Sequence, residues 1–529
     1  MINCLILTGI VSMNFTRLFL VAMLAYLPSV SFCQNITSTN DEQKTAQYFD
    51  SIKNNSSELL AFLENMPKGG DLHNHLSGAI YPEELITIAQ NDNLCFDPQN
   101  FSISPQQSCK TFLIHDLSNH EDLYDATIDN WSLRNFHSTT ETKHDHFFAI
   151  FGKISPIVST HNANVLTDII SDAAAENIHY LEIMVDTYDL NMPTGDGDPA
   201  GALGKQIGWN ANFSQLRQSL LSNGMPQIVQ QLKQHIDTMY NNSQAQLHCG
   251  TSSALPGCKV KVNFIYITLR EQPPAQVFAQ LLSAFELANT DPRVVGMNIV
   301  QQEDGYIALR DYDLHMRMIG YLHSVYPKVH ITLHAGELNP NNVTPENMRF
   351  HIRDAVEIAN SERIGHGSSV AFEKNSQQLL NEMAQKHILV EMNLTSNAEL
   401  LGVTGNDDPL PLYLQYHVPV VLSTDDEGIL RTTLTREFER AILTYHLSYP
   451  TIKEMVRNSI TYSFLPGDSI WNNADKLIIN NACVNDSLGS ENPDATCQQF
   501  LQKSEKAQMQ WQLENEFNSF EKNIAEQRS

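Results

Sequence analysis

Two histidines, His73 and His75, stand two positions apart at the end of a short segment that reads as a strand near the start of the chain. Alternate residues of a β-strand point to the same face, so a strand ending here would present both imidazoles together. Two imidazoles on one face can bind a single metal ion. We therefore expect the rest of the chain to supply the other ligands of a metal site.

Three further motifs carry side chains of the metal-ligating and acid–base types. They are HAGE at 334–337, RIGHG at 363–367 and STDD at 423–426. Each lies at the end of an apolar run that is predicted to be a strand. Three imidazoles and one carboxylate drawn from such a set suit Zn²⁺ with one position left open for water. Bound Zn²⁺ would lower the pKa of that water to about 7 and make it a nucleophile.

The remaining groups of these motifs suit acid–base chemistry on a substrate. A carboxylic acid such as Glu337 can protonate a ring nitrogen, and an imidazole such as His366 can hold or deprotonate the water. A further carboxylate, Asp426, can accept a hydrogen bond from the substrate. The set favours hydrolysis at a carbon of a nitrogen heterocycle, with ammonia as the leaving group.

These motifs need a scaffold that brings several strand ends together. The first strand ends at His75, and seven more are predicted at 178–185, 260–269, 294–300, 329–333, 363–365, 388–392 and 418–423, with helices between most of them. Eight alternating strands and helices predict an α/β fold, a (β/α)8 TIM-type barrel whose active residues lie at the carboxyl ends of the strands. A doubly wound sheet is the alternative.

Segments outside the barrel are assigned from composition. Residues 1–33 resemble a signal peptide, because Arg17 precedes an apolar run at 18–27 and small residues follow. The run is too short to predict a stable membrane span, so the protein is expected to be secreted or periplasmic. We predict an N-terminal helical extension at 34–66, the barrel domain at 67–465 with a polar, irregular insertion at about 80–145, and a C-terminal helical extension at 466–529.

The cysteines that remain after the leader fall into three couples of short spacing. These are Cys95 with Cys109, Cys249 with Cys258, and Cys483 with Cys497. Local pairing would give three disulfides in an oxidising compartment, although other pairings are open. The formal charge of −27 argues against nucleic acid as a partner and favours a small-molecule substrate.

Over about 67–465 the chain resembles the adenosine deaminase family of the amidohydrolase superfamily, through HNHLSGA at 73–79 and the three motifs above. The leader and the insertion are similar to its secreted, growth-factor-like branch. The resemblance implies that one zinc ion per chain is bound by His73, His75, His334 and Asp425. It also implies a homodimer formed through the N-terminal helices.

The resemblance further implies a role for each remaining group. Glu337 would protonate N1 of the purine, His366 would orient the hydroxide, and Asp426 would hold N7. Attack of the zinc-bound hydroxide at C6 would convert adenosine or 2′-deoxyadenosine to the inosine product and ammonia. The chain departs from the family at Ser77, where an aspartate often meets the ribose 5′-hydroxyl, and at Gln301, where a glycine is usual.

Ser77 and Gln301, together with Asp426, are therefore the candidate substrate contacts, and Glu427 replaces the proline that usually follows the Asp-Asp pair. Another aminopurine or an N6-substituted adenosine stays open as the substrate. A secreted growth-factor-like binding protein with secondary or no activity is the alternative of another class. A two-metal amidohydrolase is disfavoured because residues 294–305 contain no lysine. A cytidine-type zinc deaminase is disfavoured because its His-x-Glu and Pro-Cys-x-x-Cys motifs are missing.

Overall fold

All eight predicted strands are present in the computed structural model, which describes residues 39–92, 94–104, 112–192 and 198–527. They form one parallel sheet, and each strand pairs with the barrel strands that come before and after it in the chain. The strands are β1 (Gly69–His75), β4 (Ile178–Val185), β5 (Lys261–Leu269), β6 (Val294–Val300), β7 (His330–Ala335), β8 (Arg363–His366), β9 (Leu389–Met392) and β10 (Val420–Leu422).

The first and last strands of this sheet meet at a short seam. Asn74 and Asp425 form an isolated parallel bridge. The backbone N–H of Asp425 donates to the carbonyl of His73 at 2.9 Å, and that of His75 donates to the carbonyl of Asp425 at 3.0 Å. The sheet therefore closes into a nearly complete barrel, as the alternation of strands and helices predicted, and the doubly wound alternative is wrong.

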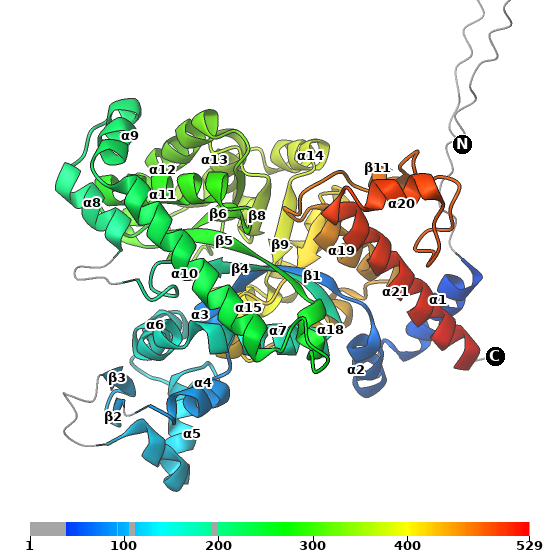
Figure 1. Cartoon of the computed structure of the whole chain (residues 1–529), viewed down its shortest axis with the longest axis horizontal. Helices are drawn as coiled ribbons and strands as arrows, with labels where there is room; N and C mark the ends of the chain where they lie inside the picture. The colour runs from blue at the N-terminus through cyan, green and yellow to red at the C-terminus, as the bar shows by residue number, and fades with distance from the viewer. Residues whose placement is uncertain (1–38, 93, 105–111, 193–197, 528–529) are drawn as a thin grey trace, which may run out of the picture.

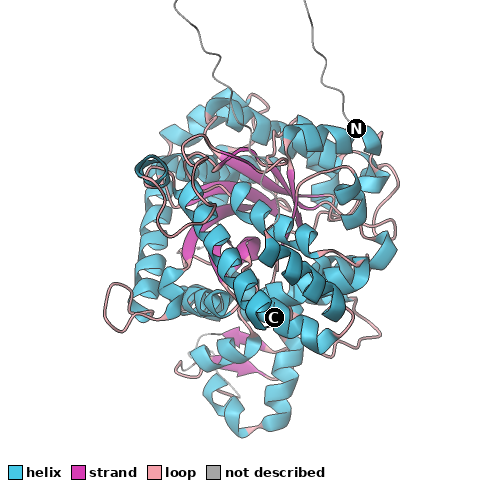
Figure 2. Ribbon diagram, turned by 90° about the vertical axis from the view of Figure 1, so that its right-hand side faces the viewer, coloured by secondary structure: helices cyan, strands magenta, loops and turns pink. Residues whose placement is uncertain are grey.

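Helices surround the barrel (Figures 1 and 2). The helices of the outer ring are α7 (Asn162–Ala175), α11 (Pro274–Thr290), α12 (Tyr306–Val325), α13 (His351–Glu357), α14 (Ser376–Lys386), α16 (Leu410–Gln415), α18 (Leu434–Tyr445) and α19 (Tyr449–Thr461). Three short helices start directly at strand ends: α3 (Leu76–Ala79), α15 (Leu394–Leu401) and α17 (Glu427–Leu430). Strands covered in this way are buried on both faces. Their sequences are therefore continuous apolar runs rather than alternating apolar and polar residues.

The long connection between β4 and β5 is helical. It contains α8 (Pro199–Ile207), α9 (Phe213–Ser222) and α10 (Met225–Gln246). After α10 the predicted disulfide between Cys249 and Cys258 closes a loop of nine residues before β5 begins. The second couple, Cys483 with Cys497, also forms a disulfide. Cys109 of the third couple lies outside the described residues.

The described parts of the insertion at about 80–145 form helices and a hairpin, so the prediction of an irregular segment was wrong there. It contains α4 (Pro82–Ala89), a hairpin of β2 (Cys95–Asp97) and β3 (Ser102–Ser104), and α5 (Glu121–Asn130), and it projects from the barrel in Figure 1. Trp131 is fully buried there and packs edge-on against Phe96. These elements are too short to leave a clear hydrophobic period in the sequence. Helix α6 (Lys143–Thr160) then returns the chain to the barrel.

The two extensions pack against each other. The first contains α1 (Asn40–Ile52) and α2 (Ser56–Asn65), and the second contains β11 (Trp471–Asn473), β12 (Ile478–Ile479), α20 (Ala495–Leu501) and α21 (Glu505–Gln527). Helix α1 lies beside α21 in Figure 1, and the rings of Phe62 and Phe520 meet edge-on. The predicted leader at 1–33 lies outside the described residues, and the homodimer stays a prediction. Within the part that the structure describes, no helix combines the length and apolar character of a membrane span.

Candidate metal centre and active-site pocket

Four side chains from three barrel strands converge at the carboxyl end of the barrel. The Nε2 atom of His334 lies 3.1 Å from Nε2 of His73 and 3.3 Å from Nε2 of His75. The Oδ1 atom of Asp425 lies 3.4 and 3.3 Å from the same two nitrogens. Tetrahedral Zn²⁺ with ligands at about 2.0–2.2 Å places its ligand atoms roughly 3.3 Å apart. The four residues therefore fit a four-coordinate ion, and no other such group occurs among the described residues.

Two buried polar side chains orient the histidines. Nδ1 of His73 lies 2.8 Å from the carboxylate of Glu391, and Nδ1 of His334 lies 3.1 Å from Oδ1 of Asn298. Asn298 also accepts the backbone N–H of His334 at 2.9 Å. When each Nδ1–H donates to its acceptor, each Nε2 keeps a free lone pair that faces the others. Such supporting contacts fix the tautomer and raise the basicity of a metal ligand.

Asp425 is held as an anion. Burial opposes its ionisation, but its close contacts with the imidazoles of His73 and His75 outweigh burial and keep the pKa of its carboxyl well below the usual range. Its backbone is also unusual, because φ is +62°. His366 at +65° and Gln301 at +78° share this left-handed conformation. Residues held in such strained conformations cost about 1–3 kcal/mol each and concentrate at functional sites.

Glu337 has the properties of a proton donor. Burial raises the pKa of its carboxyl to about 8, and the charges of Asp425 and Glu303 add to the effect. The group is therefore protonated at neutral pH. Its loop is held from beneath, because Glu303 accepts the backbone N–H groups of Gly336 and Glu337, each at 2.9 Å.

His366 faces the same space as Glu337. Its Nε2 atom lies 3.8 Å from Oε1 of Glu337 and 3.9 Å from Oδ2 of Asp425. Burial lowers the pKa of His366 to about 4, so the ring is neutral and can accept a proton. Nδ1 of His366 lies 3.3 Å from Oδ1 of Asn397, which fixes the plane of the ring.

Asp426 presents a buried oxygen with nothing bound to it. Its Oδ1 atom has no hydrogen-bond partner in the described part of the chain. Burial, reinforced by Asp425, raises the pKa of this carboxyl well above its usual value. A Cβ atom on Gly78 would lie 1.6 Å from that oxygen, so only glycine fits here. The glycine of the HNHLSGA motif therefore makes room for a carboxyl that is ready to bind a ligand.

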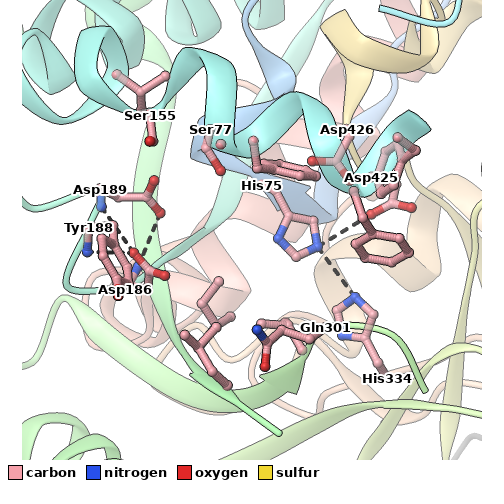
Figure 3. A pocket seen from close by; sticks show the side chains of 18 of the residues that line it. His75, Ser77, Ser155, Asp186, Tyr188, Asp189, Gln301, His334, Asp425 and Asp426 are labelled. Carbon is pink, nitrogen blue, oxygen red and sulfur yellow. Dashed lines mark hydrogen bonds and ion pairs between the residues drawn. The ribbon is translucent and has the colours of Figure 1, made fainter. Parts of the chain in front are cut away.

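These groups stand at one end of a cavity of about 340 Å³. Helix α6 supplies an aromatic wall of Phe147, Phe148 and Phe151. At the other end lie the turn after β4 and the side chain of Ser77, as Figure 3 shows. In the described chain no lysine or arginine lines this cavity.

The turn after β4 is acidic. Asp186 accepts the backbone N–H groups of Tyr188 and Asp189, and Asp189 accepts that of Asp186 at 3.1 Å. Burial, followed by the charge of Asp186, raises the pKa of Asp189 well above its usual range, and Ser77 hydrogen-bonds to Asp189. This end of the cavity is therefore rich in acceptors for hydroxyl groups.

The sequence-predicted site residues are brought together. All of them except His73 line the cavity, and His73 lies beneath the other metal ligands. The full set is His73, His75, His334, Asp425, Glu337, His366, Asp426, Ser77 and Gln301. Gln301 takes the left-handed backbone that a glycine would take, and its Oε1 accepts the N–H of Glu271 at 2.8 Å. Glu427, which replaces the usual proline after the Asp-Asp pair, lines a different cavity and is not a substrate contact.

Sequence reasoning missed the aromatic wall and the acidic turn. Periodicity alone could not show that helix α6 lies over the barrel mouth. Asp186 was detectable, because it directly follows a predicted strand whose carboxyl end should face the site. The supporting residues Asn298, Glu303 and Glu391 are buried polar groups, and only the tertiary structure shows which side chain each of them orients.

Comparisons with known proteins identify relatives of this chain. A family model described as adenosine deaminase matches residues 230–478. Adenosine deaminase from Clostridium perfringens is 33% identical over 135 residues, which are 25% of this chain and only 37% of that protein. Adenosine deaminase from Clostridium kluyveri is 23% identical over 427 residues, 78% of this chain and 93% of that protein. A zinc-bound amidohydrolase from Burkholderia ambifaria shares the fold, with a TM-score of 0.51, 15% identity and coverage of 77% and 88%.

Proposed function

This chain belongs to the adenosine deaminase family of the amidohydrolase superfamily, whose members hydrolyse C–N bonds, and from that premise we propose that it deaminates adenosine and 2′-deoxyadenosine. The products are the corresponding inosine nucleoside and ammonia. The observation that carries this proposal is the position of Glu337, His366 and Asp426 around the converged histidines and Asp425.

The resident ion is proposed to be one zinc per chain, held by His73, His75, His334 and Asp425. When bound, zinc lowers the pKa of a coordinated water and so supplies the nucleophile. The geometry of the ligand atoms, with separations of 3.1–3.4 Å, supports a tetrahedral ion. The two imidazoles with Nδ1 partners are fixed in the orientation that such an ion needs.

The protein's own residues then move the protons. Hydrolysis forms a bond between the water oxygen and C6 of the purine and breaks the bond from C6 to the amino nitrogen. His366, neutral because of burial, accepts a proton from the water and passes it to the departing amino group, which leaves as ammonia. Glu337, protonated at neutral pH, donates a proton to N1 and takes one back from the new C6 hydroxyl group as the bond to the amino nitrogen breaks. Asp426, whose raised pKa also keeps it protonated, donates a hydrogen bond to the lone pair of N7.

The charge of the cavity supports a nucleoside rather than a nucleotide as substrate. No lysine or arginine among the described lining residues is available to pair with a phosphate group, which would instead meet the carboxyl groups of Asp186 and Asp189. Sugar hydroxyls can donate to the oxygens of these carboxyl groups, with Ser77 beside them. The aromatic wall of α6 offers an apolar face for the rest of the nucleoside.

Export is proposed on two grounds. The predicted leader at 1–33 is one, and the two local disulfides, Cys249–Cys258 and Cys483–Cys497, are the other. Disulfides of this kind persist in oxidising compartments. The growth-factor-like binding protein raised as an alternative finds no support in the comparisons, and the complete set of acid, base and metal-ligating residues favours an enzyme.

The decisive experiment measures ammonia release by purified, zinc-replete protein. The substrates are adenosine, 2′-deoxyadenosine, adenine, N6-methyladenosine and adenosine monophosphate, assayed side by side. We expect the two nucleosides to have the highest kcat/KM and the monophosphate to be a poor substrate. Turnover of none of the five overturns the proposed reaction, and a preference for the monophosphate or the N6-methyl compound overturns the proposed substrate.

A further inference from the structure

A second cavity, of about 450 Å³, lies between α4, α7 and α17 and shares no lining residue with the active-site pocket. We call it the acidic cavity. Its charged lining consists of six carboxylates, Glu83, Glu84, Asp168, Asp172, Glu176 and Glu427. It contains no lysine or arginine in the described part of the chain.

Three of these carboxylates follow one face of α7. Asp168, Asp172 and Glu176 are spaced four residues apart, so they lie one above the other along the helix. Like charges at this spacing destabilise a helix. Burial raises the pKa of Asp168 and of Asp172 to about 6, and Glu84 across the cavity contributes to both shifts. The carboxylates are therefore close enough to repel one another.

The nearest cations leave most of this charge unbalanced. Arg431 pairs with Glu83 at 2.6 Å and lies over the ring of Tyr81. Lys68 contacts the backbone carbonyl of Glu176 rather than its side chain. Glu84, Asp168 and Asp172 have no hydrogen-bond or ion-pair partner within the described residues.

Glu427 is the independent sign of a ligand. Its side chain is only 8% exposed, lines the acidic cavity, and has no hydrogen-bond or ion-pair partner among the residues that the structure describes. A largely buried carboxyl group without a partner is costly, and natural structures normally satisfy such a group. A cationic donor in the cavity would supply the missing partner.

The spacing of the carboxylates decides the kind of cation. A single metal ion needs three or more ligand atoms close together, and the described residues offer such a group only at His73, His75, His334 and Asp425. The carboxylates of α7 are instead separated by about one helical turn, roughly 5.4 Å each. A flexible chain that carries several ammonium groups matches this spacing, because each group donates up to three hydrogen bonds to a separate carboxylate.

We propose that the acidic cavity binds a linear polyamine, with one ammonium group at Glu427 and the others along Asp168 and Asp172 of α7. The site is distinct from the proposed deaminase site and does not depend on that reaction. Its occupant neutralises the row of like charges on α7 and stabilises the fold.

Isothermal titration calorimetry of the full-length, zinc-loaded protein with spermidine tests this site. We expect saturable binding of one spermidine per chain, weakened by salt and accompanied by a higher melting temperature. The double variant Asp168→Asn/Asp172→Asn should bind at least tenfold more weakly. The variant should still fold, because it removes repulsion within α7, and its melting temperature without spermidine should equal or exceed that of the parent protein.

A charge-matched control separates a site from general attraction to an acidic protein. Glu121→Gln/Asp122→Asn removes the same two charges from exposed positions on α5 and should leave spermidine affinity unchanged. An equal loss of affinity in this control overturns the proposal, as does the absence of saturable binding. Binding of Mg²⁺ or Ca²⁺ that spermidine cannot displace also overturns it. Should the double variant misfold, Glu84→Gln, on the exposed side of the cavity, provides the same test.

Discussion

The backbone N–H of Glu337 donates to the buried carboxylate of Glu303 at 2.9 Å. Hydrogen bonding from His351, together with the charge of Arg270, outweighs the effect of burial and holds the pKa of Glu303 below its usual value. Glu303 is therefore an anion directly beneath the loop that carries Glu337. The same contact fixes the position of the proposed acid and helps to keep it protonated, because the negative charge of Glu303 raises the pKa of Glu337.

Replacing Glu337, the proposed acid, should greatly slow turnover without loss of zinc from the site. Glu337→Gln removes the proton donor but keeps a side chain of similar size, and general acid catalysis contributes roughly 10²–10⁴-fold. We expect kcat for adenosine to fall by about that factor while zinc content is unchanged. Glu346→Gln, at an exposed position in the following loop, is the control and should be fully active. Unchanged turnover of Glu337→Gln would remove Glu337 from the role of acid.

The raised pKa of Glu337 predicts how activity depends on pH. The group must be protonated to donate, and its pKa is about 8, so the active form is present below that pH and is lost above it. We expect kcat/KM to fall on the alkaline side by about tenfold per pH unit. The residual activity of Glu337→Gln should not show this alkaline fall in kcat/KM. A profile that instead rises through pH 8 would contradict the assignment.

The partner of His73 should control metal affinity. Glu391→Gln keeps the shape of the side chain but removes the charge that orients His73 at 2.8 Å. Loss of such a supporting contact typically weakens metal binding by about 10–100-fold. Competition with a chromophoric chelator measures this change. Glu362→Gln, which removes an exposed carboxylate beside β8, should bind zinc like the parent protein.

The acidic turn should recognise the sugar. Asp189→Asn replaces the carboxyl group that is hydrogen-bonded to Ser77 by an amide, and a buried polar group left without its partner costs about 1–3 kcal/mol. We expect KM for adenosine to rise by about tenfold or more with a smaller change in kcat. Any turnover of adenine, which has no sugar, should change little. An equal effect on both compounds would show that Asp189 acts through the fold rather than through the sugar.

The C-terminal helix should contribute to stability. The side chain of Phe517 on α21 is fully buried in the main hydrophobic core. Its replacement by alanine should lower the free energy of unfolding by about 3–5 kcal/mol. Urea denaturation followed by circular dichroism measures the loss. Leu443→Ala, at a partly exposed position on α18, should cost far less.

The barrel could be predicted because its strands are encoded locally, whereas the choice of four metal ligands from the polar strand ends came from the family resemblance. Each buried strand is an apolar run with a polar residue at its carboxyl end, and His73 and His75 show the strand period directly. Parallel strands in a barrel bring all such ends to one rim, so His334 and Asp425 could be placed there without a structure.

The walls of the pocket were harder to predict for a physical reason. The phenylalanines of α6 have the spacing of any helix that packs on a core, and only the tertiary structure shows that part of this face covers a cavity. The insertion after β1 was missed as an ordered unit because its helices and its hairpin are only a few residues long. The backbone of Gln301 could not be predicted either. The barrel imposes a left-handed conformation on this residue, which glutamine disfavours.

The seam between β1 and the segment after β10 has a consequence for biosynthesis. Asn74 and Thr424, joined by a hydrogen bond of 2.9 Å across this seam, are 350 positions apart in the chain. A growing polypeptide displays His73 and His75 on the ribosome long before Asp425 has been translated. The complete set of four ligands therefore exists only after Asp425 has been translated, so metal binding by all four cannot precede synthesis of the last barrel strand.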